Sequence, residues 1–137
     1  MDNVAIIRRY TEECWGQGKL DLVDELVAPD ARAGHGDLVT GPQAYKDEIL
    51  AIRGGLSDYR TKVEEIFGAG DAVAVRWTTT GRHTGSLFGN PPTGKDVVIA
   101  GVDIFHLRDG QIVDHYGESA MPMLLEQIGA LPVSAAG

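Results

Sequence analysis

The sequence predicts a single α+β domain, in which helices pack on a strongly curved antiparallel or mixed sheet. The first part of the chain carries apolar residues at helical spacing, whereas the period changes to 2 from Tyr59 onward. Helices followed by a run of strands are typical of α+β domains. The 137 residues suffice for one domain with a sizeable core. We expect it to span residues 1–137, with a frayed tail from about residue 131.

Three helices are predicted before the strands. The first is capped by Asp2 or Asn3 and ends at the glycines 16 and 18. The second covers residues 21–27, and a loop or short edge strand follows at residues 30–41. The third helix opens at Gly41-Pro42, because proline suits the first helical position, and ends at residues 54–55.

Alternating patterns predict four strands and a final helix. The strands cover residues 59–67, 72–81, 97–107 and 111–118. The Asp109-Gly110 turn favours a short hairpin with a bulge between the last two strands. Because Val97 to Leu107 is apolar on both faces, we expect a sheet that is covered on both sides. Ser119 caps the last helix.

Composition excludes several classes of partner. The net charge is −8 and the basic residues are scattered, so nucleic acid is not expected to bind. No apolar run reaches the roughly 18 residues of a membrane span, and the N-terminus lacks a secretory pattern. Cys14 is the only cysteine, which excludes an internal disulfide and is consistent with a cytoplasmic location. No Cys/His spacing indicates a metal site.

Asp103 is the leading catalytic candidate. It interrupts an apolar strand on the face that carries Ile99 and Phe105. A buried carboxylate must be paired, changed in pKa or open to a wet cavity. The first hypothesis is a general acid or base in a cavity, and the second is a structural aspartate bonded to the backbone or to Arg76.

Three further residues are candidates for acid–base chemistry. His115 suits proton transfer near neutral pH, but a bulge would decide which face of its strand points inward. Glu118 follows closely and is either a catalytic carboxylate or an exposed one. His35 lies in a loop, where a solvated histidine is the alternative.

A set of aromatic residues and one histidine is predicted to form the wall of a ligand pocket or part of the core. Flat polycyclic ligands stack well on aromatic walls. The candidates for substrate binding are Trp15, Tyr45, Trp77, His83, Phe88 and Tyr116; for His83 the alternative is a role in anchoring the loop that follows it.

Several motifs resemble the SnoaL-like polyketide cyclase family of the NTF2-like superfamily. They are H-x-G and G-x-P-P-T-G-K within residues 83–95, D-I-F-x-x-x-D-G-x-I-V-x-H at 103–115, and L-L-E-Q-I-G at 124–129. GPQAY at 41–45 and CWGQGKLDLVDELVAPD at 14–30 match as well. The resemblance covers roughly residues 4–129.

The resemblance implies a cone-shaped NTF2-like fold, a small-molecule substrate and a homodimer, with no metal and no organic cofactor. Members with known activity close polyketide rings by intramolecular aldol condensation, using acid–base side chains in the cone. Two positions depart from the pattern: the catalytic aspartate of those cyclases aligns with Gly117, with Glu118 next in line, and an active-site histidine aligns with Asp103. The sequence therefore has either moved its carboxylate across the hairpin, lost the activity or changed reaction.

Three functions follow from this reading. The first is a cofactor-independent acid–base enzyme that closes a ring or isomerises a largely apolar, oxygenated substrate. In it Asp103 removes or relays a proton, and His115 or His35 stabilises the enolate oxygen. The second is an epoxide-opening cyclase or hydrolase, and the third is a non-catalytic binding or dimerisation module.

Overall fold

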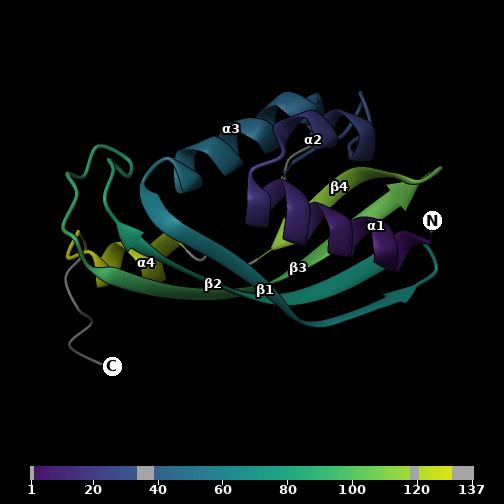
Figure 1. The fold of residues 1–137 in the computed structure, drawn as a ribbon. Helices are drawn as coiled ribbons and strands as arrows, with labels where there is room; N and C mark the ends of the chain where they lie inside the picture. The colour runs from purple at the N-terminus through teal and green to yellow at the C-terminus, as the bar shows by residue number, and fades with distance from the viewer. Residues whose placement is uncertain (1, 34–38, 118–120, 131–137) are drawn as a thin grey trace.

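The computed structural model describes residues 2–33, 39–117 and 121–130. Helices come first, then four consecutive strands, then one short helix (Figure 1). The elements are α1 (Asn3–Arg9), the π-helix η1 (Tyr10–Trp15), α2 (Leu20–Leu26), α3 (Gly41–Arg53), β1 (Leu56–Ala69), β2 (Ala72–His83), β3 (Asp96–Arg108), β4 (Gln111–Gly117) and α4 (Met121–Gln127).

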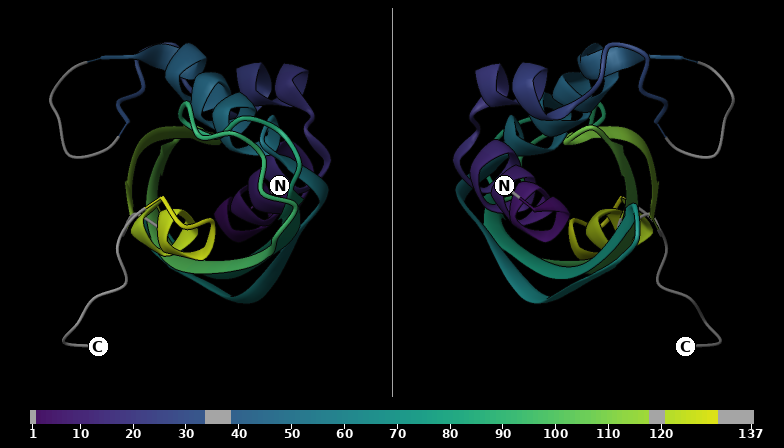
Figure 2. Two further views of the ribbon diagram at one scale, coloured as in Figure 1. Left: turned by 90° about the vertical axis from the view of Figure 1, so that its left-hand side faces the viewer. Right: turned by 90° about the vertical axis from the view of Figure 1, so that its right-hand side faces the viewer.

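The four strands form one antiparallel sheet in the order β1-β2-β3-β4. The sheet curls strongly, and α1, α2 and α3 lie on its concave side (Figures 1 and 2). We call the face toward these helices the inner face. A single parallel bridge joins Val27, after α2, to Ile112 of β4. The predicted α+β class and cone-shaped fold are confirmed.

Helix α4 covers the part of β3 that extends beyond β4. The last pair between these strands joins Asp103 to Gly117, so Val98 has no partner from β4. The side-chain amide of Gln127 replaces that partner: its Oε1 accepts from the Val98 N–H at 2.7 Å, and its Nε2 donates to the Val98 carbonyl at 2.7 Å. This pairing satisfies backbone groups that a free strand edge would leave exposed.

The first helix differs from the prediction in its hydrogen bonding. Asp2 caps α1 as expected, with its carboxylate accepting from the Ala5 N–H at 2.7 Å. From Tyr10 the helix widens into a π-helix, and the Gly16 N–H donates to the Thr11 carbonyl five residues back. Helical periodicity alone does not signal such a segment, which is rare and occurs frequently at functional sites.

The expectation of a sheet covered on both sides is wrong for the single chain. The inner-face residues of β3, Ile99, Phe105 and Leu107, are buried. On the outer face, Val98, Val102 and Ile104 are 43–55% exposed. Apolar residues on both faces of β3 therefore indicate a second surface that the chain itself leaves open.

None of the helices within the described ranges is long and apolar enough to cross a membrane.

Candidate functional site

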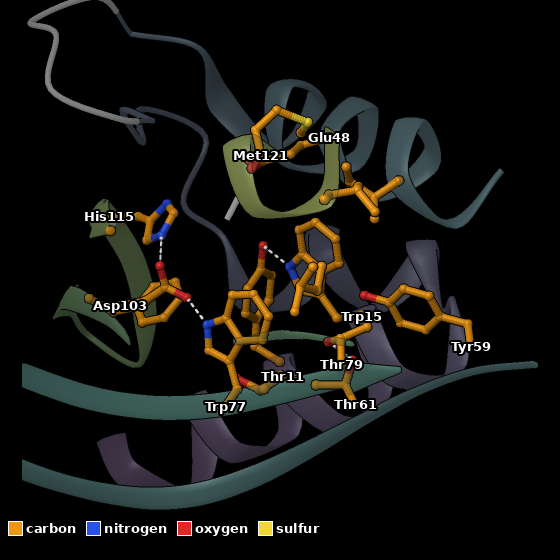
Figure 3. A pocket seen from close by; sticks show the side chains of 16 residues that line it. Thr11, Trp15, Glu48, Tyr59, Thr61, Trp77, Thr79, Asp103, His115 and Met121 are labelled. Atoms are coloured by element: carbon orange, nitrogen blue, oxygen red, sulfur yellow. Dashed lines mark hydrogen bonds and ion pairs between the residues drawn. The ribbon is translucent and has the colours of Figure 1, made fainter. Parts of the chain in front are cut away.

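A cavity of about 250 Å³ lies between the inner face of the sheet and the helices (Figure 3). Most of its wall is apolar or aromatic, and a few polar groups project into it, as is typical of small-molecule sites. The lining residues are Tyr10, Thr11, Trp15, Glu48, Ile52, Tyr59, Thr61, Trp77, Thr79, Ile99, Asp103, Phe105, His115, Gly117, Met121 and Leu124.

Strand alternation and one bulge bring Asp103 and His115 to the same cavity wall. Asp103 shares the inner face with buried Phe105, as its position in the strand predicts. In β4 the register shifts by one residue: His106 pairs with Asp114, whereas Leu107 pairs with Ile112. This bulge turns both Ile112 and His115 inward, although simple alternation would place them on opposite faces.

Asp103 holds two hydrogen bonds at the cavity wall. The Trp77 indole Nε1–H donates to Oδ2 at 2.6 Å, and Nε2 of His115 lies 2.9 Å from Oδ1 (Figure 3). An ionised carboxylate only accepts hydrogen bonds, so Nε2 of His115 carries the proton in this pair. In the neutral form of the imidazole with this tautomer, Nδ1 carries a lone pair that can accept a proton.

Two glycines make this arrangement possible. A Cβ on Gly101, the partner of Trp77 on β3, would lie 2.6 Å from the indole ring. A Cβ on Gly117, the partner of Asp103 on β4, would collide with Oδ1. Both glycines therefore leave space for a side chain of the neighbouring strand.

Packing fixes the His115 ring. It stacks on Phe105, with ring centroids 4.8 Å apart and planes 18° apart. On the side of the helices, the Tyr45 ring lies near the His115 ring, with their centroids 6.3 Å apart. A histidine held by stacking and by a carboxylate has a defined orientation for proton transfer.

Glu48 of α3 contributes a second carboxyl group to the cavity wall. Although Glu48 also reaches the exterior, desolvation by the surrounding protein atoms raises the pKa of its carboxyl group. The protonated form of His115 lowers this pKa, and the Asp103 charge raises it. Neither apolar spacing nor any motif marked this residue in the sequence.

The π-helix η1 supplies two aromatic residues of the wall, Tyr10 and Trp15. Nε1 of Trp15 donates to the Tyr10 hydroxyl at 3.2 Å, and burial raises the pKa of Tyr10 well above its usual range. Cys14, in the same segment, is fully buried, and burial raises the pKa of its thiol to about 12. The thiol therefore lacks the thiolate character that a nucleophile needs.

Three hydroxyl-bearing residues lie on the cavity wall away from Asp103 (Figure 3). Thr61 and Thr79 are paired residues of β1 and β2, and their Oγ1 atoms are 2.8 Å apart. The Tyr59 side chain lies beside both threonines on this wall (Figure 3); burial raises the pKa of its hydroxyl, and the two threonines act on it in the opposite direction. We call Tyr59, Thr61 and Thr79 the hydroxyl cluster.

Four residues predicted to contact substrate do not line the cavity. Tyr45 lies in the core, 2% exposed, where its hydroxyl donates to the Arg32 carbonyl. His83 is fully buried and accepts a hydrogen bond from the Thr93 backbone N–H through Nδ1 at 3.2 Å, which places it as an anchor of the 84–95 loop.

The other two residues that do not line the cavity are exposed. Phe88 is 56% exposed on the loop between β2 and β3, where its backbone adopts a positive φ of 49°. Tyr116 lies opposite Ile104 on the outer face of the sheet, because the bulge in β4 turns His115 inward instead. Trp15 and Trp77 do line the cavity, as predicted.

Two predicted catalytic residues, His35 and Glu118, lie outside the described residues, and their roles stay predictions. Of the lining residues that sequence reasoning missed, Tyr59, Thr61 and Thr79 were hidden because their common face depends on strand register. Within ranges 2–33, 39–117 and 121–130, no three His, Cys, Asp or Glu side chains are grouped so that they could hold a metal ion.

Comparisons with known proteins agree with this architecture. The chain is 33% identical over 118 residues to a nogalonic acid methyl ester cyclase from Streptomyces nogalater, covering 82% of this chain and 87% of the relative. It is 27% identical over 118 residues to the aklanonic acid methyl ester cyclase DauD from Streptomyces sp. (strain C5), covering 82% and 72%.

A solved structure supports the fold, and a family model identifies the family. The structure of TsrD from Streptomyces laurentii superposes with a TM-score of 0.83 at 22% identity, covering 96% of this chain and 99% of that chain. The family model described as SnoaL-like polyketide cyclase matches residues 5–128. This chain belongs to the SnoaL-like polyketide cyclase family.

Proposed function

We propose that this protein is a cofactor-independent acid–base enzyme that closes a ring on a polyketide-type substrate by intramolecular aldol condensation. The observation that carries the proposal is the hydrogen-bonded Asp103–His115 pair in the wall of a ligand-sized, largely apolar cavity. The relatives named as methyl ester cyclases support the reaction class.

In the proposed mechanism, the Asp103–His115 pair removes a proton from the carbon next to a substrate carbonyl. Because both oxygens of Asp103 already accept hydrogen bonds, the proton goes to Nδ1 of His115, and Asp103 stabilises the imidazolium. The enolate carbon then attacks a second carbonyl carbon of the same molecule, forming the new C–C bond. The resulting alkoxide takes the proton back from His115.

Confinement supplies a further part of the rate. Trp15 and Trp77 form flat walls that hold a polycyclic substrate folded, so that the two reacting carbons meet within one molecule. The two reacting carbons then meet through a conformational change of one bound molecule, without the entropy loss of bringing two molecules together.

The charges on the cavity wall favour a neutral substrate. Asp103 and Glu48 are the carboxyl groups on this wall, and the lining residues that the structure describes include no lysine or arginine. A free carboxylate of the substrate would have no cation to pair with there and would lose its hydration. We therefore propose that the acid group of the substrate is masked as an ester, as in the names of the relatives.

The test uses nogalonic acid methyl ester with Asp103→Asn and His115→Gln variants. We expect kcat to fall at least 100-fold in each, while the substrate dissociation constant changes little, because general acid–base catalysis contributes about 10²–10⁴. Asp109→Asn is the matched control, since Asp109 lies in the turn of the same hairpin and its positive φ of 51° suits asparagine. Turnover by Asp103→Asn at the rate of this control would contradict the proposal.

We further propose that the outer face of the sheet forms a homodimer. One row of paired positions crosses all four strands on this face, Phe67, Ala74, Ile104 and Tyr116, and Val98 and Val102 extend it along β3. Phe67 is 62% exposed in the single chain. An apolar surface of this extent is typical of protein interfaces.

A second copy suits this surface because the row runs through an antiparallel sheet, so a twofold axis can place it against itself. Analytical ultracentrifugation of the wild type should give a dimer, and Ile104→Lys should give a folded monomer. The control Gln43→Lys places the same charge on an exposed residue of α3, on the concave side of the sheet, and it should leave the dimer intact.

We also propose that the protein works in the cytoplasm. Its single cysteine, Cys14, is a buried free thiol, which suits a reducing compartment. Fractionation of cells that express the chain, followed by immunoblotting, tests this location; recovery in the extracellular fraction of intact cells would contradict it.

A further inference from the structure

The hydroxyl cluster lies at the opposite end of the cavity from the Asp103–His115 pair. Thr79 pairs with Ile99, and Asp103 lies four residues further along β3. At about 3.3 Å per residue, the two polar groups are roughly 13 Å apart. Figure 3 shows the rings of Trp15 and Trp77 between them.

A bulge in β1 builds this cluster. Ser57 pairs with Arg82 and Arg60 pairs with Thr80, so β1 holds one extra residue at this point. Asp58 takes up the irregularity with a positive φ of 51°. As a result, Leu56 is buried and Tyr59 still faces the cavity, although the two differ by an odd number of residues.

Arg53 fixes the Tyr59 ring. Its guanidinium carbon lies 4.5 Å from the ring centroid, and Nη1 donates to the backbone carbonyls of Trp15 at 2.7 Å and Gly16 at 3.1 Å. The Tyr59 ring is thereby held on the cavity wall beside the two threonines before any ligand enters (Figure 3). Such preorganisation lowers the entropy cost of binding.

The chemistry of the cluster suits a neutral oxygen atom. Each hydroxyl carries one proton and two lone pairs, and its proton can rotate. One proton can turn toward a ligand while the remaining hydroxyls stay hydrogen-bonded to each other. Burial raises the pKa of Tyr59, so its hydroxyl keeps the proton that it donates.

We propose that the hydroxyl cluster is a second binding subsite, which donates a hydrogen bond to a ketone, ester carbonyl or phenol oxygen at the far end of the substrate. This inference rests on the proposed function for its direction: the remote oxygen sets how deep the substrate lies, and thus which carbon meets Asp103 and His115. Its binding step is independent of catalysis and can be measured without turnover.

The experiment compares two flat probes of equal shape, 9-fluorenone, which carries one ketone, and fluorene, which has no oxygen. Binding is followed by quenching of the fluorescence of Trp15 and Trp77, which line the cavity. We expect the wild type to bind 9-fluorenone more tightly than fluorene. Thr79→Val and Tyr59→Phe should each weaken 9-fluorenone binding by about five- to tenfold and leave fluorene unchanged, since each removes a hydrogen-bond donor.

Two controls separate this role from others. Thr79→Ser keeps the hydroxyl and should bind 9-fluorenone within about twofold of the wild type, whereas a purely structural role of the threonine would make Ser and Val behave alike. Asp103→Asn should also retain 9-fluorenone binding, so a failure of the proposed catalysis is distinguishable from a failure of the subsite.

The proposal is overturned if the wild type binds the two probes equally, or if the variants weaken both probes alike or neither. Circular dichroism melts establish that each variant is folded. Tyr59→Phe removes one oxygen and leaves the packed ring in place, so it decides the question alone if Thr79→Val does not fold.

Discussion

Oδ1 of Asp103 lies in the space above Gly117 that a side chain at that position would fill. The two residues are directly paired across β3 and β4. The resemblance to the aldol cyclases implies that their catalytic aspartate stands at the position of Gly117. The carboxylate here reaches nearly the same space from the opposite strand, and His115 supplies the imidazole from β4.

Gly117→Ala should displace the Asp103 carboxylate. The new methyl group occupies the position of Oδ1, so the hydrogen bond to His115 cannot keep its present geometry. We expect kcat to fall by at least tenfold and the free energy of unfolding by about 1–3 kcal/mol, as for other overpacked sites. Steady-state kinetics and urea unfolding measure both effects. The control is Ala100→Gly, which changes an exposed residue on the outer face of the neighbouring strand β3. Gly110→Ala is unsuitable as a control, because Gly110 has a positive φ.

An exchange across the hairpin extends this prediction. Asp103→Ala should lose activity, and adding Gly117→Asp should recover part of it, because the second carboxylate enters the space that the first has left. The measurement is kcat of the double variant relative to Asp103→Ala. A double variant no more active than Asp103→Ala would show that the two strands are not equivalent supports for the carboxylate.

Trp77→Phe should lower activity while an aromatic ring stays in the cavity wall. The phenyl ring keeps an aromatic side chain in the wall, but Oδ2 of Asp103 loses the hydrogen bond from the indole Nε1–H at 2.6 Å. We expect a five- to fiftyfold loss of kcat, because the Asp103 carboxylate is then held less firmly against His115. Steady-state kinetics measure the loss, and an unchanged kcat would show that the Trp77 hydrogen bond does not position the carboxylate.

Glu48→Gln should change the pH dependence of stability. Because desolvation raises the Glu48 pKa above its ordinary value of 4.5, the folded chain holds this proton more tightly than the unfolded chain. The stability that the proton contributes is fully present below about pH 4.5 and is lost as pH rises through the raised folded pKa. Glutamine cannot ionise, so the Glu48→Gln variant does not lose this part of the stability as pH rises.

Urea unfolding at several pH values between 4 and 8 tests this effect. The free energy of unfolding of the wild type should fall with rising pH relative to Glu48→Gln. Asp47→Asn, an exposed carboxylate on the same helix, is the control and should follow the wild type. A constant difference between Glu48→Gln and wild type at all pH values would refute the shift.

His83→Ala should destabilise the chain by about 2–4 kcal/mol, because it removes a fully buried ring and the acceptor of the Thr93 N–H. His83 does not line the cavity, so kcat below the melting temperature should stay within about threefold of the wild type. Thermal unfolding and steady-state kinetics give the two values. If the variant instead had unchanged stability and a strongly raised KM, the result would support the predicted contact between His83 and the substrate.

The sequence was a sufficient guide wherever periodicity was unbroken. Apolar alternation in β3 placed Asp103 on the inner face, and the family motifs identified the fold. It was insufficient at irregular points. The bulge in β4 decides that His115, and not Tyr116, faces the cavity, and the bulge in β1 does the same for Tyr59. Glu48 was missed because its pKa depends on atoms that α3, β3 and β4 bring together.

The π-helical segment Tyr10–Trp15 has an evolutionary consequence. A π-turn holds one more residue than an α-turn, so deleting a single codon there would restore regular winding. The wide turn absorbs its extra residue locally, so the residues before and after it would keep their positions around the helix axis. One small genetic event would thereby change only the side chains that the segment itself, with Tyr10 and Trp15, offers to a ligand, while the rest of the helix, the sheet and its acid–base pair stayed in place.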